Sequence, residues 1–209
     1  KKNMVHALNN INLKIDDRET VAIIGESGAG KSTLLHIMSC IDNFDGEYYL
    51  DNIDINKLSE SKKSKLRSSK IGIVLQDFAL IDDFTVFENV MTPLYFNKKI
   101  KDKKGSVMRA LKKTGIASLK SKKVSQLSGG QKQRVAISRA LVTNPEYIFA
   151  DEPTGSLDSK TSEEIVKMLF DLNRNGITII IVTHNLDIAN KCQRVIEIKD
   201  GNIIEDNCS

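Results

Sequence analysis

The stretch Val21-Ala22-Ile23-Ile24-Gly25-Glu26-Ser27-Gly28-Ala29-Gly30-Lys31-Ser32 joins a short apolar run to a glycine-rich loop. The run 21–24 predicts a buried strand, and the apolar spacing over residues 33–41 predicts a helix after the loop. In this context the loop fits the phosphate-binding spacing GxxxxGK[ST]. Its glycines let backbone N–H groups surround phosphates, Lys31 can reach the β- and γ-phosphates, and the Ser32 hydroxyl can ligate Mg²⁺. We therefore predict a nucleotide-binding α/β protein, with a glycine-rich turn that holds no ligand as the alternative.

Four apolar runs of the chain each end at a polar group. They cover residues 21–24, 71–75, 147–150 and 177–183, and they lead into the loop at 25–32, Gln76, Asp151-Glu152 and His184 respectively. Such runs are typical of strands that are buried on both faces of a largely parallel sheet. Ligands bind at the carboxyl ends of the strands in open α/β sheets. We therefore expect the four groups to meet in one site.

Each of these polar residues also has a simpler interpretation. Gln76 alone is typical of a surface glutamine, and His184 of a hydrogen-bonded structural histidine. Asp151 occupies the usual place of a Mg²⁺ partner in a phosphate-loop protein, and Glu152 beside it could polarise a water. The two acids would instead supply an N-cap and a first-turn charge if a helix began there. Pro153 and the turn-like residues 154–156 argue against an immediate helix.

A second anion-binding feature lies at Leu127-Ser128-Gly129-Gly130-Gln131. Apolar residues recur after it at Val135, Ile137, Ala140 and Leu141, as on one face of a helix. The Ser-Gly-Gly start predicts a helix whose N-terminus is left open to bind an anion. We expect this segment to be exposed in a single copy of the chain.

Two turn signals predict antiparallel pairs beside the parallel core. Asp51-Asn52 separates residues 47–50 from 53–55, and Asp200-Gly201 separates 195–198 from 202–204. Asn, Asp and Gly tolerate the positive φ values of tight hairpin turns.

The composition is ordinary for one α/β domain that buries a core. The chain has 209 residues, 40% of them hydrophobic and 28% charged. Its longest apolar stretch, residues 177–182, is far shorter than the ~20 residues of a membrane-spanning helix, so we expect any membrane role to come through a partner. The three cysteines form no CxxC pair and predict free thiols in a reducing compartment.

The positive charge is concentrated in two stretches. Residues 98–123 hold eleven Lys or Arg and one acid, and residues 56–70 hold six and one. Such stretches could face anionic lipid headgroups or an acidic partner, but a solvated lysine surface is the favoured interpretation. Nucleic-acid binding is disfavoured because no aromatic side chains are interleaved with these charges.

Taken together, the motifs resemble the nucleotide-binding subunit of an ATP-binding-cassette (ABC) transporter over essentially the whole chain. In chain order they are the phosphate loop GESGAGKS (25–32), Gln76 in VLQDFAL, the signature LSGGQ (127–131), the acidic strand YIFADEP (147–153), SLD (156–158) and His184. The resemblance implies the fold of a P-loop NTPase: a mostly parallel core sheet, a small antiparallel β subdomain and a helical subdomain. It also implies a single domain over residues 1–209, with the helical subdomain at about 77–142.

The resemblance further implies the roles of individual residues. ATP would be contacted by Gly25, Glu26, Ser27, Gly28, Ala29, Gly30, Lys31, Ser32 and Thr33, and by Ser128, Gly129, Gly130 and Gln131. Mg²⁺ would be held by Ser32, Gln76 and Asp151, and the catalytic residues would be Lys31, Gln76, Glu152 and His184. Glu152 resembles the general base that acts on the attacking water, and His184 would contact the γ-phosphate.

The partners expected from the resemblance are a transmembrane permease and a second nucleotide-binding subunit. The two subunits would pack head to tail, so that the signature of one closes over ATP held by the other. The chain would then work at the cytoplasmic face of a bacterial cell membrane. Residues 71–94, 126–141 and 151–161 resemble the branch for lipoprotein release, macrolide efflux and peptide-antibiotic export.

Two other functions stay open within the resemblance. A DNA-repair ATPase is disfavoured because the interval between Gln76 and the signature Ser128 is short and has no cysteine pair. The sequence does not distinguish a transporter from a regulator that passes its nucleotide state to a membrane partner. One departure concerns the aromatic residue on which the family stacks adenine, because residues 1–20 contain no Phe, Tyr or Trp. We expect that residue before Lys1, with His6 as a weak substitute, and a reduced nucleotide affinity for this form.

Overall fold

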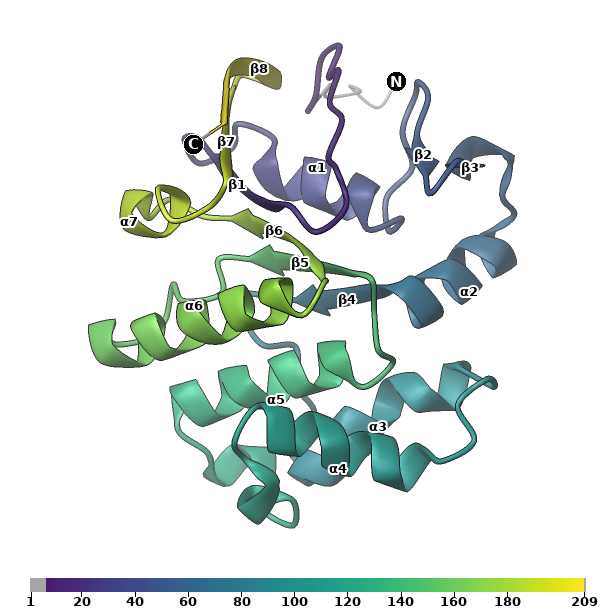
Figure 1. The fold of residues 1–209 in the computed structure, drawn as a ribbon, viewed down its shortest axis with the longest axis vertical. Helices are drawn as coiled ribbons and strands as arrows, with labels where there is room; N and C mark the ends of the chain where they lie inside the picture. The colour runs from purple at the N-terminus through teal and green to yellow at the C-terminus, as the bar shows by residue number, and fades with distance from the viewer. Residues whose placement is uncertain (1–6, 209) are drawn as a thin grey trace, which may run out of the picture.

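A six-stranded sheet runs through the centre of the computed structural model, which describes residues 7–208 (Figure 1). The strand order is β4-β5-β6-β1-β7-β8. The strands are β1 (Thr20–Ile24), β4 (Ile71–Val74), β5 (Tyr147–Asp151), β6 (Thr178–Val182), β7 (Arg194–Lys199) and β8 (Asn202–Cys208). All neighbouring pairs are parallel except β7 with β8. The four runs predicted as strands and the mostly parallel sheet are therefore confirmed.

Helices bury both faces of this sheet. Alternate side chains of β5 enter different cores, Ile148 and Ala150 on one face and Tyr147 and Phe149 on the other. The first face packs against α5 (Gly129–Leu141) and α6 (Ser159–Arg174), with α3 (Val86–Phe96) and α4 (Lys103–Lys113) packed on α5, and the second face packs against α1 (Lys31–Met38) and α2 (Glu60–Lys70). Short elements complete the chain: η1 (Ile55–Lys57), η2 (Ala117–Leu119), η3 (Val124–Gln126) and α7 (Leu186–Ala189). Within residues 7–208, no helix has the length and apolar character needed to cross a bilayer.

Both predicted hairpins are confirmed. Strands β2 (Tyr49–Leu50) and β3 (Ile53–Asp54) form a separate antiparallel sheet, and their turn residues Asp51 and Asn52 have φ values of 50° and 61°. Asp200 and Gly201 connect β7 to β8 with φ values of 47° and 77°. These left-handed conformations match the right-handed twist of the flanking strands.

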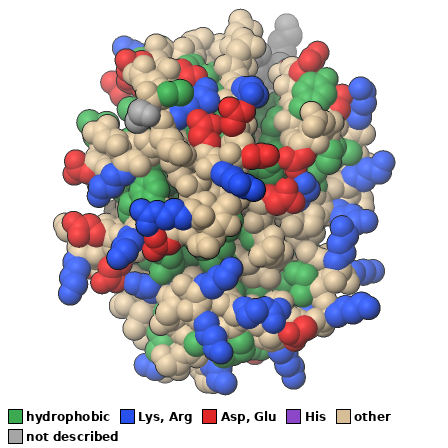
Figure 2. Space-filling view, viewed as in Figure 1, with side chains coloured by type: hydrophobic (Ala, Val, Ile, Leu, Met, Phe, Trp, Pro, Cys, Tyr) green, Lys and Arg blue, Asp and Glu red, His purple; other side chains and the backbone are tan. Residues whose placement is uncertain are grey.

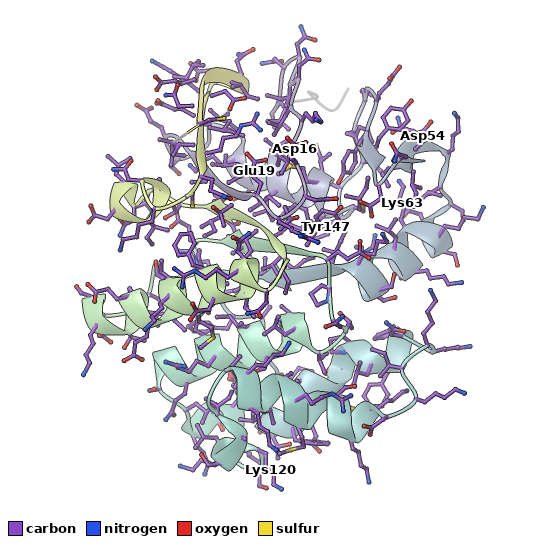
Figure 3. The ribbon with its side chains drawn as sticks, viewed as in Figure 1. Asp16, Glu19, Asp54, Lys63, Lys120 and Tyr147 are labelled. Atoms are coloured by element: carbon purple, nitrogen blue, oxygen red, sulfur yellow. The ribbon has the colours of Figure 1, made fainter. Side chains whose placement is uncertain are left out.

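The β2–β3 turn is held against the core sheet by a polar network at the start of β5. Asp51 accepts hydrogen bonds from the Tyr147 hydroxyl and from Lys70, and Lys70 also pairs with Glu146 at 3.0 Å. Tyr147 lies near the centre of the molecule in Figure 3. Burial alone raises the pKa of Asp51, but its hydrogen bonds to Lys70 and Tyr147 lower it on balance. The network therefore stabilises the charged carboxylate.

The helix after the glycine-rich loop differs from the predicted range 33–41. It begins earlier, at Lys31, because Gly30 occupies the N-cap with φ 103°. It ends earlier, at Met38, because Cys40 adopts a left-handed φ of 59°. An apolar pattern does not reveal either backbone change.

The helices α3, α4 and α5 lie together at the lower side of Figure 1, within residues 77–142. Lys and Arg side chains crowd this part of the surface in Figure 2. Helix α5 also packs on the sheet, where a Cβ on Gly72 of β4 would lie 2.8 Å from the Ala140 carbonyl oxygen. A separate helical subdomain over this range therefore stays a prediction.

Candidate functional site

An open pocket of about 430 Å³ lies where β1, β4, β5 and β6 end. It is lined by Ala7, Gly25, Ser27, Gly28, Gly30, Lys31, Ser32, Thr33, Gln76, Asp151, Glu152, Val182 and His184. The expected convergence of four strand ends is confirmed. Of the loop residues predicted to contact ATP, Glu26 is exposed and Ala29 is buried, and the lining of the pocket includes neither of them.

The glycine-rich loop owes its shape to close backbone approaches. A Cβ on Gly25 would collide with the Ile198 carbonyl, and one on Gly30 would lie 2.5 Å from the Ala7 carbonyl oxygen. Both glycines also have positive φ values. The Lys31 ammonium lies across the loop and donates to the carbonyls of Gly25 at 2.8 Å and Glu26 at 2.7 Å. The loop thus holds a positive charge at the wall of the pocket.

The N-terminus of α1 supplies a second positive feature. Its N-cap Gly30 has no side chain to cap the helix, and its first turn contains no acid. The first N–H groups of the helix therefore face the pocket side without an intrahelical acceptor, and the helix dipole adds to their charge. Such an end binds phosphate.

The acidic side of the pocket is built by the ends of β5 and β6. Glu152 Oε1 accepts a hydrogen bond from the backbone N–H of His184 at 2.9 Å and lies 2.7 Å from His184 Nδ1. Its other oxygen, Oε2, accepts from the Thr183 hydroxyl at 3.3 Å. Helix α6 begins only at Ser159 with Asp158 as its N-cap, so Asp151 and Glu152 do not cap it. The alternative role of the two acids as helix-start charges is therefore wrong.

Three oxygen donors suited to Mg²⁺ line the same pocket. They are the Ser32 hydroxyl, the Gln76 amide and the Asp151 carboxylate. Each comes from a different segment: the start of α1, the segment after β4, and the last residue of β5. Hard cations of this kind prefer oxygen ligands.

The signature segment 127–131 lies outside this pocket. Ser128 and Gly129 are exposed, as expected, but Leu127 is buried and packs in the core, so the expected exposure of the whole segment is wrong for that residue; α5 begins directly after Ser128. Its N-terminus is partly capped, because two of its backbone N–H groups have side-chain acceptors, and anion binding there stays a prediction. Ser128 and Gln131 form a capping box, in which Ser128 Oγ accepts from Gln131 N at 3.4 Å and Gln131 Oε1 accepts from Ser128 N at 3.2 Å. The spacing Ser-x-x-Gln is a sequence signal for this cap.

Two further residues of α5 support the pocket and were not predicted. Gln133 donates from Nε2 to the Pro153 carbonyl at 2.7 Å, directly after Glu152. Arg139 donates to the carbonyls of Phe78 and Ala79, shortly after Gln76, and burial lowers its pKa. Polar residues within the apolar pattern of α5 were the signal that could have revealed them. Their partners are not visible in sequence.

The segment before β1 contributes Ala7 to the lining of the pocket. Asn9 N donates to the Gly201 carbonyl at 2.7 Å and holds this segment beside the turn between β7 and β8. His6, which was expected to substitute weakly for an aromatic residue, lies outside the described residues. The expected lower nucleotide affinity stays a prediction.

The sequence and the fold both match known proteins. The sequence model described as ABC transporter matches residues 8–155. The uncharacterized ABC transporter ATP-binding protein YvrO of Bacillus subtilis is 45% identical over 98% of this chain and 90% of its own length. The macrolide export ATP-binding/permease protein MacB of Mannheimia succiniciproducens is also 45% identical over 98% of this chain. Here the chain spans 32% of the relative's length.

A solved structure extends the similarity to three dimensions. It is the dimeric post-hydrolysis state of the ATP-binding cassette MJ0796, bound to ADP and Pi, from Methanocaldococcus jannaschii. Its TM-score is 0.91 and its identity 42%, with 100% of this chain and 93% of the other covered. The chain therefore belongs to the ABC transporter family, as a cassette that binds and hydrolyses ATP.

Proposed function

We propose that the pocket binds ATP with Mg²⁺, and that this cassette works as a head-to-tail pair on a membrane permease. The observation that carries the proposal is the separation of two half-sites. The phosphate loop, the acids and His184 line one pocket, whereas Ser128 and Gly129 are exposed outside it. An exposed signature can complete a site on a second copy, as the dimeric cassette MJ0796 supports.

Within one pocket, the phosphates would lie against the loop 25–32 and the N-terminus of α1. Lys31 and the backbone N–H groups would balance their charge. Ser32, Gln76 and Asp151 would hold Mg²⁺, which neutralises charge on the β- and γ-phosphates. The Glu152 carboxylate would accept a proton from the attacking water, and its contact with His184 keeps it oriented. Catalysis then rests on positioning and charge.

The second copy would bring Ser128, Gly129, Gly130 and Gln131 to the γ-phosphate. These residues start a helix that packs closely on the segment after Glu152. A Cβ on Gly129 would lie 3.3 Å from Leu157 Cδ2, and one on Gly130 would lie 2.5 Å from Thr161 Cγ2. Gln131 would contact ATP in one of two ways. Either its side chain leaves the cap on Ser128, or its backbone makes the contact.

A permease would dock on an apolar groove beside the edge strand β4. This groove of about 400 Å³ lies between α2, α3 and α5 and includes Ile71, Ile73, Pro93 and Phe96. Tyr95 and Phe96 are 64% and 73% exposed. MacB, whose ATP-binding and permease parts form one protein, supports this occupant. The docked cassette would lie at the cytoplasmic face of the membrane, and the relatives favour an exporter.

The substitution Glu152→Gln tests the proposal. We expect ATP turnover to fall by about a thousandfold, because the amide cannot accept the proton. We also expect ATP to drive the variant into a stable dimer, measured by size-exclusion chromatography. Glu205→Gln, at an exposed acid of β8 that is not in the lining of the pocket, is the control and keeps wild-type turnover. Wild-type turnover by Glu152→Gln contradicts the role of Glu152, and a monomer at saturating ATP contradicts the paired site.

A further inference from the structure

Gln133 is a buried amide on α5 that is only half satisfied. The residue is 1% exposed, and its Nε2 donates to the Pro153 carbonyl at 2.7 Å. Its Oε1 has no hydrogen-bond partner among the residues that the structure describes. A buried acceptor without a partner destabilises a fold, and an apolar side chain of the same volume would avoid that cost. Packing alone therefore does not account for a glutamine here.

The partner of Gln133 lies next to an unfavourable backbone conformation. Glu152 has a φ of 43°, in the left-handed region that residues other than glycine seldom adopt. Such a conformation persists only when its surroundings hold it. Glu152 N donates to the Val182 carbonyl at 2.9 Å, and Gly155 N donates to the Glu152 carbonyl at 3.1 Å. The bond from Gln133 holds the next residue, Pro153, inside the turn that the bond between Gly155 and Glu152 closes.

Other polar side chains of α5 are directed elsewhere. Ser138 is buried and pairs with the Thr114 hydroxyl at 2.6 Å, on the side of α4. Arg134 donates to the Thr114 carbonyl and to Glu164. Gln133 is thus placed to connect α5 with the loop after β5, and its own side chain does not line the pocket.

We propose that Gln133 is a positioning residue for hydrolysis, which holds the Pro153 carbonyl and through it the Glu152 carboxylate. This inference rests on the proposed role of Glu152 as the base. Gln133 acts on the hydrolytic step, and neither ATP binding nor ATP-driven pairing depends on it.

The test compares Gln133→Met, which keeps the volume and removes the hydrogen bond, with Ser138→Ala, which breaks a buried hydrogen bond elsewhere on α5. We expect Gln133→Met to lower kcat by roughly tenfold to a hundredfold and to leave the Kd for ATP within about twofold. In a Glu152→Gln background it keeps ATP-driven dimerisation. Ser138→Ala loses stability but keeps kcat within about twofold. An unchanged kcat in Gln133→Met, or a parallel loss of dimerisation, overturns the proposal.

A second variant decides the matter should Gln133→Met fail to fold. Gln133→Glu has the same shape, but its carboxyl group donates to the Pro153 carbonyl only when it is protonated. We expect its kcat, relative to wild type, to rise as the pH is lowered, whereas a pH-independent ratio overturns the proposal. Glu152→Gln assayed alongside separates the two ideas. If Glu152→Gln is inactive while Gln133→Met has normal activity, only the proposed role of Gln133 is wrong. If Glu152→Gln is fully active, the proposed role of Glu152 is wrong as well.

Discussion

Glu152 Oε1 contacts His184 twice, at 2.9 Å from the backbone N and at 2.7 Å from Nδ1 of the ring. The two residues are separated by 32 positions and are brought together by the neighbouring strands β5 and β6. The Glu152 side chain is 13% exposed, whereas that of His184 is 72% exposed. The carboxylate is therefore oriented from one side by a histidine that remains open to the pocket.

His184→Ala should lower ATP turnover by about a hundredfold, because it removes the ring contact that orients the carboxylate. ATP affinity should change little, since the loop and α1 bind the phosphates. Steady-state hydrolysis and equilibrium ATP binding measure the two effects. His36→Ala is the control, because His36 pairs with Asp42 and is not in the lining of the pocket. Loss of binding in proportion to turnover would contradict the positioning role of His184.

Lys31→Met should weaken ATP binding by about 10- to 100-fold, because hydrogen bonds to charged groups contribute about 1.5–3 kcal/mol. The ammonium lies within 2.8 Å of two loop carbonyls, at the place where phosphates are expected. Titration calorimetry with ATP gives the affinity. Lys57→Met, at a side chain that is 82% exposed in η1 and is not in the lining of the pocket, should bind like wild type. Equal affinities of Lys31→Met and wild type would exclude a phosphate contact.

Ser128→Arg should block hydrolysis by at least about a hundredfold while single-subunit ATP binding is kept. The reason is that Ser128 is exposed and outside its own pocket, so a bulky cation there disturbs only the site on the second copy. Ser61→Arg, on the exposed first turn of α2, is the matched control. If the monomeric Ser128→Arg variant no longer binds ATP, the interpretation that Ser128 acts on the second copy is wrong.

Sequence predicts those parts of the molecule that short-range patterns determine. The strands, both hairpin turns and the phosphate loop follow from apolar runs and from residues that tolerate positive φ. The contact of Glu152 with His184 depends on strand order, and the bond from Gln133 to Pro153 depends on how α5 packs. Such contacts have no local signal. The cap formed by Ser128 and Gln131 does have one, in the spacing Ser-x-x-Gln.

Asp51→Asn should make stability less sensitive to acid. The amide keeps the left-handed turn and can still accept from Tyr147, but it loses the ion pair with Lys70. The pKa of Asp51 is lowered in the fold, so its charge stabilises the protein above the unfolded value of about 3.9, and this contribution is lost as the pH falls through the lowered pKa. Urea unfolding near pH 7 should show a loss of about 1 kcal/mol for the variant.

The same measurement at about pH 3 should show a smaller difference, because the wild-type carboxylate is by then partly protonated. Asp45→Asn, at an exposed position, is the control and should match wild type at both pH values. A stability difference that does not shrink in acid would mean that the turn geometry, and not the charge on Asp51, holds the β2–β3 hairpin to the start of β5.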